Sequence, residues 1–285
     1  MKILYTTDLH GDREKYQMLV PIAKKAGVNT IINGGDILPT KEDLLSNQRK
    51  FITSFLDSHF SELQDAGIDF IGYLGNDDLG IFDDEFTRIT EKYKGIYNLD
   101  RKKVLIGDYE FIGMNLVVDY PFRLKDRCRI DSPTSGIPRQ NGDAYISRNG
   151  RWQRVSNWRK YVYNLPSIED ELKRLPQPTD WEKTIYLFHM PPCRIGLDHC
   201  FDGRKVGSNS IYNFISKYQP MLTLHGHIHE SPKMSGAWKN NIGKTTCIQP
   251  GQGTHLDFAL MDLSDLRIER IQKKIKRKKS YVSRI

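Results

Sequence analysis

The sequence predicts an α/β layered fold in which at least some strands run parallel. Apolar runs at residues 2 to 6, 28 to 32 and 68 to 74 have the length of buried strands, and polar residues or glycines follow each run. Between them, residues 16 to 26 and 41 to 66 show apolar positions at helical spacing. Alternation of strands and helices in this order is typical of an α/β fold, because helical crossovers join parallel strands.

Signals at the element ends support these assignments. Asp12 is a suitable N-cap for the first helix, and Gly27 follows the last apolar residue of that helix. The second, longer helical stretch leads directly into the third strand, which stops at Gly75. We therefore expect three consecutive strands joined by two helical crossovers.

After about residue 94 the pattern changes to short strands separated by turns. Residues 95 to 99, 103 to 106 and 109 to 116 favour antiparallel pairing. Residues 119 to 182 are irregular and rich in Arg, Asp, Pro and Trp, with one helix expected at 168 to 175. We interpret residues 119 to 182 as a lid-like excursion over the main fold, not as a separate domain.

Strand signals return in the last third of the chain. They lie at residues 184 to 188, 221 to 224, 245 to 248 and 256 to 261, with a helix at 208 to 218. We expect one domain over residues 1 to 269, followed by a basic tail over residues 270 to 285. The tail holds eight cations and no acid, and because the net charge of the chain is +8, the rest is formally neutral (8 − 8 = 0). A tail of this kind is either a solvated terminus or a segment that contacts nucleic acid or anionic lipid.

Composition limits the class of protein. Of 285 residues, 38% are hydrophobic, which is enough for a sizeable core. The four cysteines show no C-x-x-C spacing, so the sequence indicates neither a cysteine zinc site nor a dithiol redox motif. No apolar run approaches the roughly 18 residues of a membrane span, and the first residues do not resemble a signal peptide. We expect a cytoplasmic protein without membrane association, and the oligomeric state stays open.

Polar side chains follow five of the expected strands. In open α/β sheets, ligand sites lie at the carboxyl ends of strands, so these residues are expected to converge. They combine carboxylate, amide and imidazole groups, which suit Mn²⁺, Fe²⁺ or Zn²⁺. Seven ligands exceed the needs of one tetrahedral ion and fit two ions that share a bridging carboxylate. The set is Asp8, His10, Asp36, Asn76, His189, His227 and His229.

These segments read D-L-H, G-G-D, G-N-D, H-M-P-P and G-H-I-H, and in this order, over about residues 3 to 262, they resemble the calcineurin-like metallophosphoesterase superfamily. The resemblance implies a four-layer sandwich of two mixed β-sheets flanked by helices. It also implies two divalent metal ions (Mn, Fe or Zn) and a metal-bridging hydroxide that attacks phosphorus in line. Its ligand pattern gives one ion Asp8, His10 and His229 and the other Asn76, His189 and His227, with Asp36 bridging.

The third motif departs from the family. Many members have a histidine after the asparagine, thought to help protonate the leaving oxygen, and Asp77 stands there instead. A carboxylate with a pKa of about 3.9 is mostly ionised at neutral pH, so Asp77 serves as an acid only if burial or Asp78 raises its pKa. The other interpretation is that Asp77 orients Asn76. We take Asp36, Asn76, Asp77 and His227 as catalytic candidates and expect His225 to support the metal ligands and His59 to be exposed.

Candidate substrate contacts come from weaker signals. Arg127 and Arg129 are expected to clamp phosphate oxygens, unless they are solvated loop charges. Ser208 opens a helix whose amino terminus suits an anion. His199 is one of two histidines considered as a replacement acid, the other being His255.

We therefore predict a metal-dependent phosphoric ester hydrolase, and specifically a phosphodiesterase, because the missing histidine weakens protonation of a difficult monoester leaving group. A phosphomonoesterase or protein phosphatase is the alternative within the enzyme class. A non-catalytic binding scaffold with the same fold is the second alternative. The expected partner is a phosphate-ester substrate, and nucleic acid stays open because of the basic tail.

Overall fold

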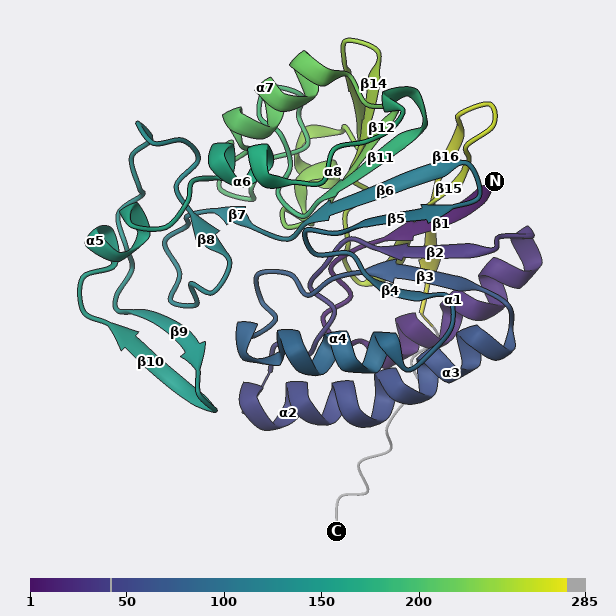
Figure 1. Ribbon diagram of the computed structural model, residues 1–285, viewed down its shortest axis with the longest axis horizontal. Coiled ribbons are helices and arrows are strands. Elements are labelled where there is room, and N and C mark those ends of the chain that lie inside the picture. Colours follow the sequence, from purple (N-terminus) through teal and green to yellow (C-terminus); the bar gives the residue numbers. More distant parts are fainter. Residues whose placement is uncertain (42, 276–285) are drawn as a thin grey trace.

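Two six-stranded β-sheets pack face to face at the centre of the molecule, and helices cover the outer side of each (Figure 1). This computed structural model describes residues 1–41 and 43–275. The predicted four-layer sandwich of two mixed sheets flanked by helices is confirmed. Among the described residues, none of the helices has the length and apolarity needed to cross a bilayer.

The first sheet has the strand order β16-β15-β1-β2-β3-β4. Its strands are β1 (Lys2–Thr6), β2 (Thr30–Asn33), β3 (Asp69–Gly72), β4 (Ile96–Asn98), β15 (His255–Asp262) and β16 (Arg267–Lys274). The helices on its outer face are α1 (Arg13–Ala26), α2 (Leu44–Lys50), α3 (Asp57–Asp65) and α4 (Asp83–Glu91), with a π-helical segment, Phe51–Leu56, between α2 and α3 and a 3-10 turn, Gly80–Phe82, before α4.

The second sheet has the order β13-β14-β12-β11-β6-β5. Its strands are β5 (Lys103–Ile106), β6 (Tyr109–Met114), β11 (Thr184–Phe188), β12 (Leu222–His225), β13 (Lys239–Ile242) and β14 (Thr245–Ile248). The helices packed on its outer face are α6 (Ile168–Arg174) and α7 (Asn209–Tyr218), whereas α5 (Trp158–Tyr163) lies at one end of the sandwich (Figure 1). The short helix α8 (Ser231–Ser235) follows β12, and a 3-10 turn, Trp181–Lys183, precedes β11.

Alternate residues of each central strand enter different cores, as the two-residue period of a strand requires. In β1, Leu4 packs under the helices of the first sheet, whereas Ile3 and Tyr5 face the second sheet. All three are fully buried. Burial on both faces explains why the sequence of this strand is a continuous apolar run rather than an alternating one.

Strand directions confirm most of the predicted topology and correct one part. Strands β1 to β3 run parallel, and β5 pairs antiparallel with β6, as expected. However, β4 was expected in an antiparallel pair. It is parallel to β3 because α4, which the sequence analysis did not assign, makes a helical crossover between them.

The segment from 119 to 182 holds more regular structure than expected. It contains β8 (Cys128–Arg129), which pairs with β7 (Val117–Val118), the hairpin β9 (Ala144–Arg148) and β10 (Arg151–Val155), and the helices α5 and α6. The hairpin and α5 lie at one end of the sandwich (Figure 1). Residues 270 to 274 of the expected tail belong to β16, because they pair with β15. Residues 276–285 of that tail lie outside the described residues.

His59 is buried, not exposed as expected. Only 4% of its surface is accessible, because it lies on the inner face of α3, stacked on Phe55 and edge-on to Tyr16. Its Nδ1 atom is 3.8 Å from the exposed carboxylate of Glu62, which is too far for a hydrogen bond. Burial lowers the pKa of His59 to about 4.

This buried imidazole is expected to make the fold sensitive to acid. As the pH falls below about 6.5, the unfolded chain binds a proton at His59 and the folded chain does not, so the free energy of unfolding decreases. Between pH 7 and pH 4.5 we expect His59 to account for about 2 kcal/mol of lost stability. Urea unfolding of the wild type and His59→Phe at both pH values measures this contribution. An equal loss in the two proteins would contradict the prediction.

Candidate metal centre

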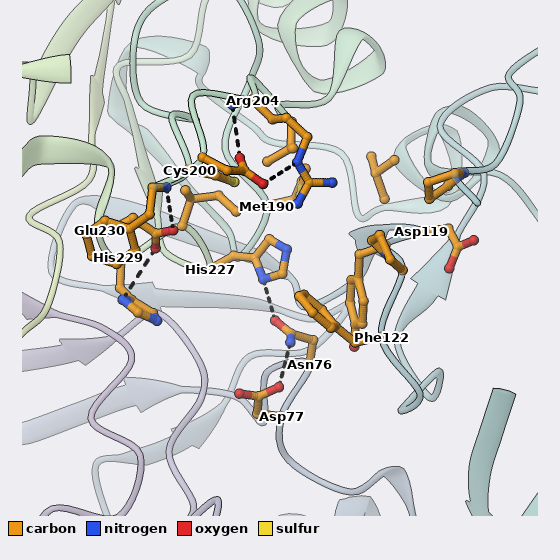
Figure 2. Close-up of a pocket in the computed structure, with 18 of the residues that line it drawn as sticks. Asn76, Asp77, Asp119, Phe122, Met190, Cys200, Arg204, His227, His229 and Glu230 are labelled. Carbon is orange, nitrogen blue, oxygen red and sulfur yellow. Dashed lines mark hydrogen bonds and ion pairs between the residues drawn. The ribbon is translucent and has the colours of Figure 1, made fainter. Parts of the chain in front are cut away.

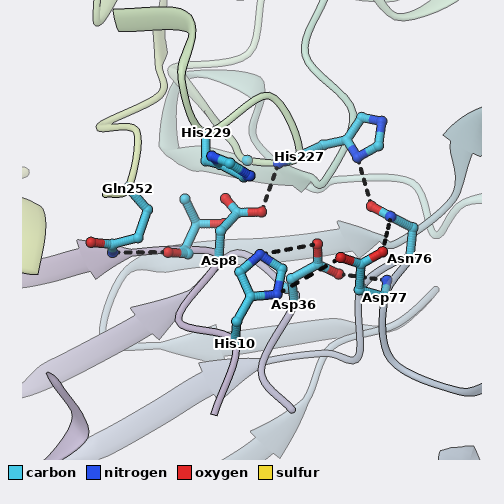
Figure 3. Close-up of polar contacts among 12 residues, drawn as sticks. Asp8, His10, Asp36, Asn76, Asp77, His227, His229 and Gln252 are labelled. Carbon is cyan, nitrogen blue, oxygen red and sulfur yellow. Dashed lines mark hydrogen bonds and ion pairs between the residues drawn. The ribbon is translucent and has the colours of Figure 1, made fainter. Parts of the chain in front are cut away.

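The loops that follow β1, β2, β3, β11 and β12 meet at one edge of the two sheets (Figure 3). These are carboxyl ends of strands, as the sequence analysis expected. The loops bring together carboxylate, amide and imidazole groups from segments that are far apart in the chain. The residues are Asp8 and His10 after β1, Asp36 after β2, Asn76 and Asp77 after β3, His189 after β11, and His227 and His229 after β12.

Asp36 stands at the centre of this arrangement. One group of potential ligand atoms combines Asp36 with Asp8 and His189, and a second combines it with His10 and Asp77. Within each group the atoms lie within 4.8 Å of one another. Asp36 Oδ2 is 3.5 Å from Nε2 of His189 and 4.0 Å from Nε2 of His10. One buried carboxylate is therefore shared by two adjoining clusters.

The Asn76 amide joins two of the histidines. Its Oδ1 atom accepts hydrogen bonds from Nε2 of His189 at 2.8 Å and from Nδ1 of His227 at 2.6 Å. Its Nδ2 atom donates to Oδ1 of Asp77 at 3.0 Å, which fixes the orientation of the amide. At the other end of the cluster, the His10 and His229 rings lie edge to face with centroids 5.8 Å apart.

The backbone at this site is unusual for residues with side chains. Asp8, His10, Asp36 and His227 all have positive φ angles, between 46° and 65°. Left-handed conformations at non-glycine residues are uncommon and occur preferentially at functional sites. Gly226 is required for space, because an added Cβ would lie 2.2 Å from Oγ1 of Thr7 and 2.8 Å from Oδ2 of Asp8.

Buried polar residues hold these loops in place. The fully buried Asp78 carboxylate accepts three backbone N–H groups, from Gly75 at 2.7 Å, Leu38 at 2.8 Å and Ile37 at 2.9 Å. It thereby ties the loop after β3 to the loop after β2. Nε2 of Gln249 donates to the Gly226 carbonyl at 2.7 Å.

His225 is also fully buried, behind the loops rather than among the ligand atoms. Its Nδ1 atom donates to the carbonyls of Phe188 and Met190, and its Nε2 atom accepts from Thr223 Oγ1 at 2.8 Å. Burial lowers the pKa of this imidazole to about 4. The ring therefore joins the ends of β11 and β12 as a neutral group.

Residues 1–231 match the family model described as calcineurin-like phosphoesterase. The chain belongs to this family. Its fold resembles that of TT1561 from Thermus thermophilus, with 19% identity and a TM-score of 0.58 over 95% of this chain and 98% of that one. It also resembles a dimetal phosphatase from Danio rerio, with 11% identity and a TM-score of 0.51 over 97% of this chain and 99% of that one. No curated protein matches the chain.

Calcineurin-like phosphoesterases typically use a dinuclear metal site, and the residues of this member fit one. Oδ2 of Asp8 and Nδ1 of His10 are buried without a hydrogen-bond partner in the described part of the chain. Leaving such atoms unpaired is unfavourable, and a charged carboxylate needs a cation nearby. The donor set of carboxylates, one amide oxygen and imidazoles suits divalent Mn, Fe or Zn.

The pKa values at the centre reflect a concentration of negative charge. Burial raises the pKa of Asp8. Burial alone would lower the pKa of His189, but the Asp36 carboxylate raises it to about 9. Burial followed by the charge of Asp36 raises the pKa of Asp77 to about 7, although 44% of the Asp77 side chain is exposed. Asp36 differs from these two acids, because burial alone would raise its pKa, but the charge of the neighbouring His189 lowers the pKa of Asp36 below its ordinary value.

The predicted phosphate clamp is not formed, which corrects the expectation for Arg127 and Arg129. Arg127 is 4% exposed, and both of its terminal nitrogens bind the carboxylate of Asp83. Nη1 of Arg129 donates to the Cys128 carbonyl at 2.7 Å. Arg127 lies under the surface, where a charge must be paired, and Arg129 is half-buried. Neither guanidinium lines the cavity beside the candidate centre.

Ser208 and His199 do not line that cavity either. The Ser208 hydroxyl caps α7 by accepting the Ile211 N–H at 3.0 Å, and it donates to Asp131 at 2.5 Å. The carboxylate of Asp131 therefore closes the helix amino terminus that was expected to hold an anion. His199 lies in the loop before α7, where its backbone N–H donates to Ser231.

A cavity of about 610 Å³ opens beside the candidate centre (Figure 2). Asp36, Asn76, Asp77, His227 and His229 line one end of it. Its walls come from residues 118 to 124, at the start of the predicted lid-like excursion, and from residues 200 to 206. No individual side chain of these two stretches was predicted to contact the substrate. The sequence pattern that could have predicted these walls is weak. It consists only of the position of residues 119 to 122 directly after a strand.

Proposed function

We propose that this chain is a dinuclear-metal phosphodiesterase. Asp8, His10 and His229 hold one divalent ion, Asn76, His189 and His227 hold the other, and Asp36 bridges the two. The membership of Asp36 in both clusters of potential ligand atoms is the observation that carries the proposal. These clusters group Asp8 with His189 and His10 with Asp77, so the division of the other ligands between the two ions follows the family pattern and not the clusters. The family and the dimetal phosphatase with the same fold support it.

Bound Mn²⁺, Fe²⁺ or Zn²⁺ supplies positive charge to a phosphate ester and lowers the pKa of water for in-line attack on phosphorus. The chain itself fixes the carboxylates that face this chemistry. The backbone N–H of His227 donates to Oδ1 of Asp8 at 3.1 Å, and the backbone N–H of Asp77 donates to Oδ1 of Asp36 at 2.9 Å. Each bond holds one oxygen of a carboxylate, so that the orientation of the second oxygen is set.

Asp77 acts as a positioning residue in this proposal. Its Oδ1 atom accepts the Asn76 amide N–H at 3.0 Å, which turns Oδ1 of Asn76 toward His189 and His227. This contact favours the orientation role over the general-acid role that the sequence left open. His227 contributes its ring as a ligand and its backbone N–H as the support of Asp8.

Two observations favour a diester over a monoester. The family histidine is replaced by Asp77, so no imidazole follows Asn76 to protonate a leaving oxygen. Among the described residues that line the cavity, Arg204 is the sole Lys or Arg, and its Nε atom is paired with Oδ2 of Asp202 at 2.7 Å. A monoester dianion carries one more negative charge than a diester and therefore needs more cationic partners than the cavity offers.

Hydrolysis of two matched aryl esters tests this function. Protein stripped with EDTA and reloaded with Mn²⁺ is expected to cleave bis(p-nitrophenyl) phosphate with a kcat/KM at least about tenfold above that for p-nitrophenyl phosphate. A faster reaction of the monoester would replace the proposal by a phosphomonoesterase or protein phosphatase. If two ions bind and neither ester is cleaved, the non-catalytic scaffold becomes the better description.

A further inference from the structure

The cavity beside the candidate centre has an apolar wall that the metal chemistry does not use. Val118, Tyr120, Phe122 and Leu124 line it from one segment, and Phe201 and Val206 line it from another. The Tyr120 ring lies next to the centre, with its centroid 5.9 Å from that of His227 and 5.7 Å from that of Phe122. Aromatic surface thus extends continuously outward from a proposed metal ligand (Figure 2).

Two of these rings are exposed to an unusual degree. Phe122 is 62% exposed and Phe201 is 61% exposed, although both are large apolar side chains. They come from segments about 80 residues apart and open onto the same cavity. Exposed apolar surface gathered in a concave site indicates ligand binding, because covering it with another apolar group is favourable.

Two of the acids in the wall, Asp119 and Asp202, are paired with cations. Asp119 forms a buried ion pair with Lys125 at 2.7 Å and also accepts from the Trp158 indole. Arg204 is paired through its Nε atom with Asp202, and both side chains of this pair are more than half exposed. Among the described lining residues, Arg204 is the sole Lys or Arg, whereas five are Asp or Glu, so the lining is unfavourable for a second phosphate or a carboxylate on the ligand.

We propose that this wall binds an uncharged, flat aromatic group of the ester substrate and that Phe122 and Phe201 determine this specificity. The proposal rests on the phosphodiesterase function proposed above and names the class of organic group that the enzyme accepts. The ester phosphorus lies at the metal end of the cavity, and the aromatic ring lies against Tyr120 and the two exposed phenylalanines. Stacking and apolar burial supply the recognition.

Phosphonates test this inference through binding, without turnover. Each carries one organic group on phosphorus, so the ring and the phosphonate must share the cavity. With Mn²⁺-reloaded protein in calorimetry, phenylphosphonate is expected to bind about tenfold more tightly than methylphosphonate. Cyclohexylphosphonate is expected to bind at least about threefold more weakly than phenylphosphonate, because it lacks the flat ring. 4-Carboxyphenylphosphonate is expected to show a similar loss, because its added negative charge enters a cavity lined by more acids than cations.

Variants connect the ring preference to the two side chains. In the double variant Phe122→Ala with Phe201→Ala, the preference for phenylphosphonate should fall below about threefold, and the Kd of methylphosphonate should stay within about twofold of wild type. The exposure of both rings makes loss of core packing small. Leu105→Ala is the matched control, because Leu105 is 66% exposed on β5 and does not line the cavity.

The outcomes separate this inference from the proposed function. Equal binding of phenylphosphonate and methylphosphonate, or an unchanged preference in the double variant, overturns the aromatic specificity and leaves the phosphodiesterase standing. Equal binding of the phenyl and cyclohexyl probes overturns it too, because apolar burial alone would then suffice. Absence of binding for every phosphonate, together with absence of Mn²⁺-dependent diester hydrolysis, overturns the proposed function and this inference with it.

Discussion

Replacing Asp36 by Asn is expected to lower kcat/KM for bis(p-nitrophenyl) phosphate by at least about 10³-fold in Mn²⁺-reloaded protein, or about 4 kcal/mol at the transition state. Asp36 contributes to both clusters of potential ligand atoms, and an amide has neither the charge nor the second oxygen that a shared ligand provides. Calorimetry of Mn²⁺ binding should show the loss of at least one of two ions.

Asparagine is the matched replacement because the fold tolerates it at this position. Asp36 has a φ of 51°, a left-handed conformation that Asn adopts more readily than most residues. The oxygen of the amide can still accept the backbone N–H of Asp77, as Oδ1 of Asp36 does now at 2.9 Å. Circular dichroism and the unfolding midpoint should therefore stay close to wild type.

Asp65→Asn is the control for the chemical change itself. Asp65 is an exposed carboxylate at the end of α3, away from the cavity, and its replacement should leave hydrolysis unchanged. If Asp36→Asn still cleaves the diester at the wild-type rate and binds two ions, Asp36 does not bridge them, and the assignment of ligands to the two ions has to be rebuilt.

The polar residues of the site could be predicted from the sequence because local patterns place them at the ends of strands. Each follows an apolar strand, and parallel strands in one sheet align their carboxyl ends, so that Asp8 after β1 and Asp36 after β2 must come close. The second sheet adds His189 and His227 by the same rule, since β11 and β12 are parallel neighbours. The five strand ends and the residue types were enough to predict the convergence.

Contacts between distant segments could not be predicted from local sequence patterns. Arg127 was expected in a loop at the surface, but it pairs with Asp83, the first residue of α4, 44 residues earlier in the chain. His59 was expected to be exposed, because one polar residue in a long helix is normally placed on the outer face. In the structure, aromatic neighbours from α1 and the π-helical segment enclose its ring. Such outcomes depend on tertiary packing, which hydrophobic periodicity does not encode.

Asp78 is the clearest example of a residue whose role depends on distant partners, and its replacement by Asn is expected to have the second large effect. Both oxygens of the buried carboxylate accept backbone N–H groups from Ile37, Leu38 and Gly75. In either orientation, the NH₂ group of Asn would face at least one of these donors. We expect a loss of about 2–3 kcal/mol in the free energy of unfolding. Diester hydrolysis and Mn²⁺ affinity should fall by about 10–100-fold, because the loops that carry Asp36 and Asn76 lose their link.

Asp77→Asn is the comparison variant for Asp78→Asn. The same chemical change is made one residue earlier, at a side chain that is 44% exposed and whose Oδ1 atom accepts a single N–H from Asn76. Because the amide oxygen can still accept that N–H, we expect stability near wild type and a loss of hydrolysis below about tenfold. A loss of several hundredfold in Asp77→Asn with unchanged Mn²⁺ binding would instead assign Asp77 to proton transfer. Equal stability of Asp78→Asn and Asp77→Asn would contradict the role of Asp78 in joining the two loops.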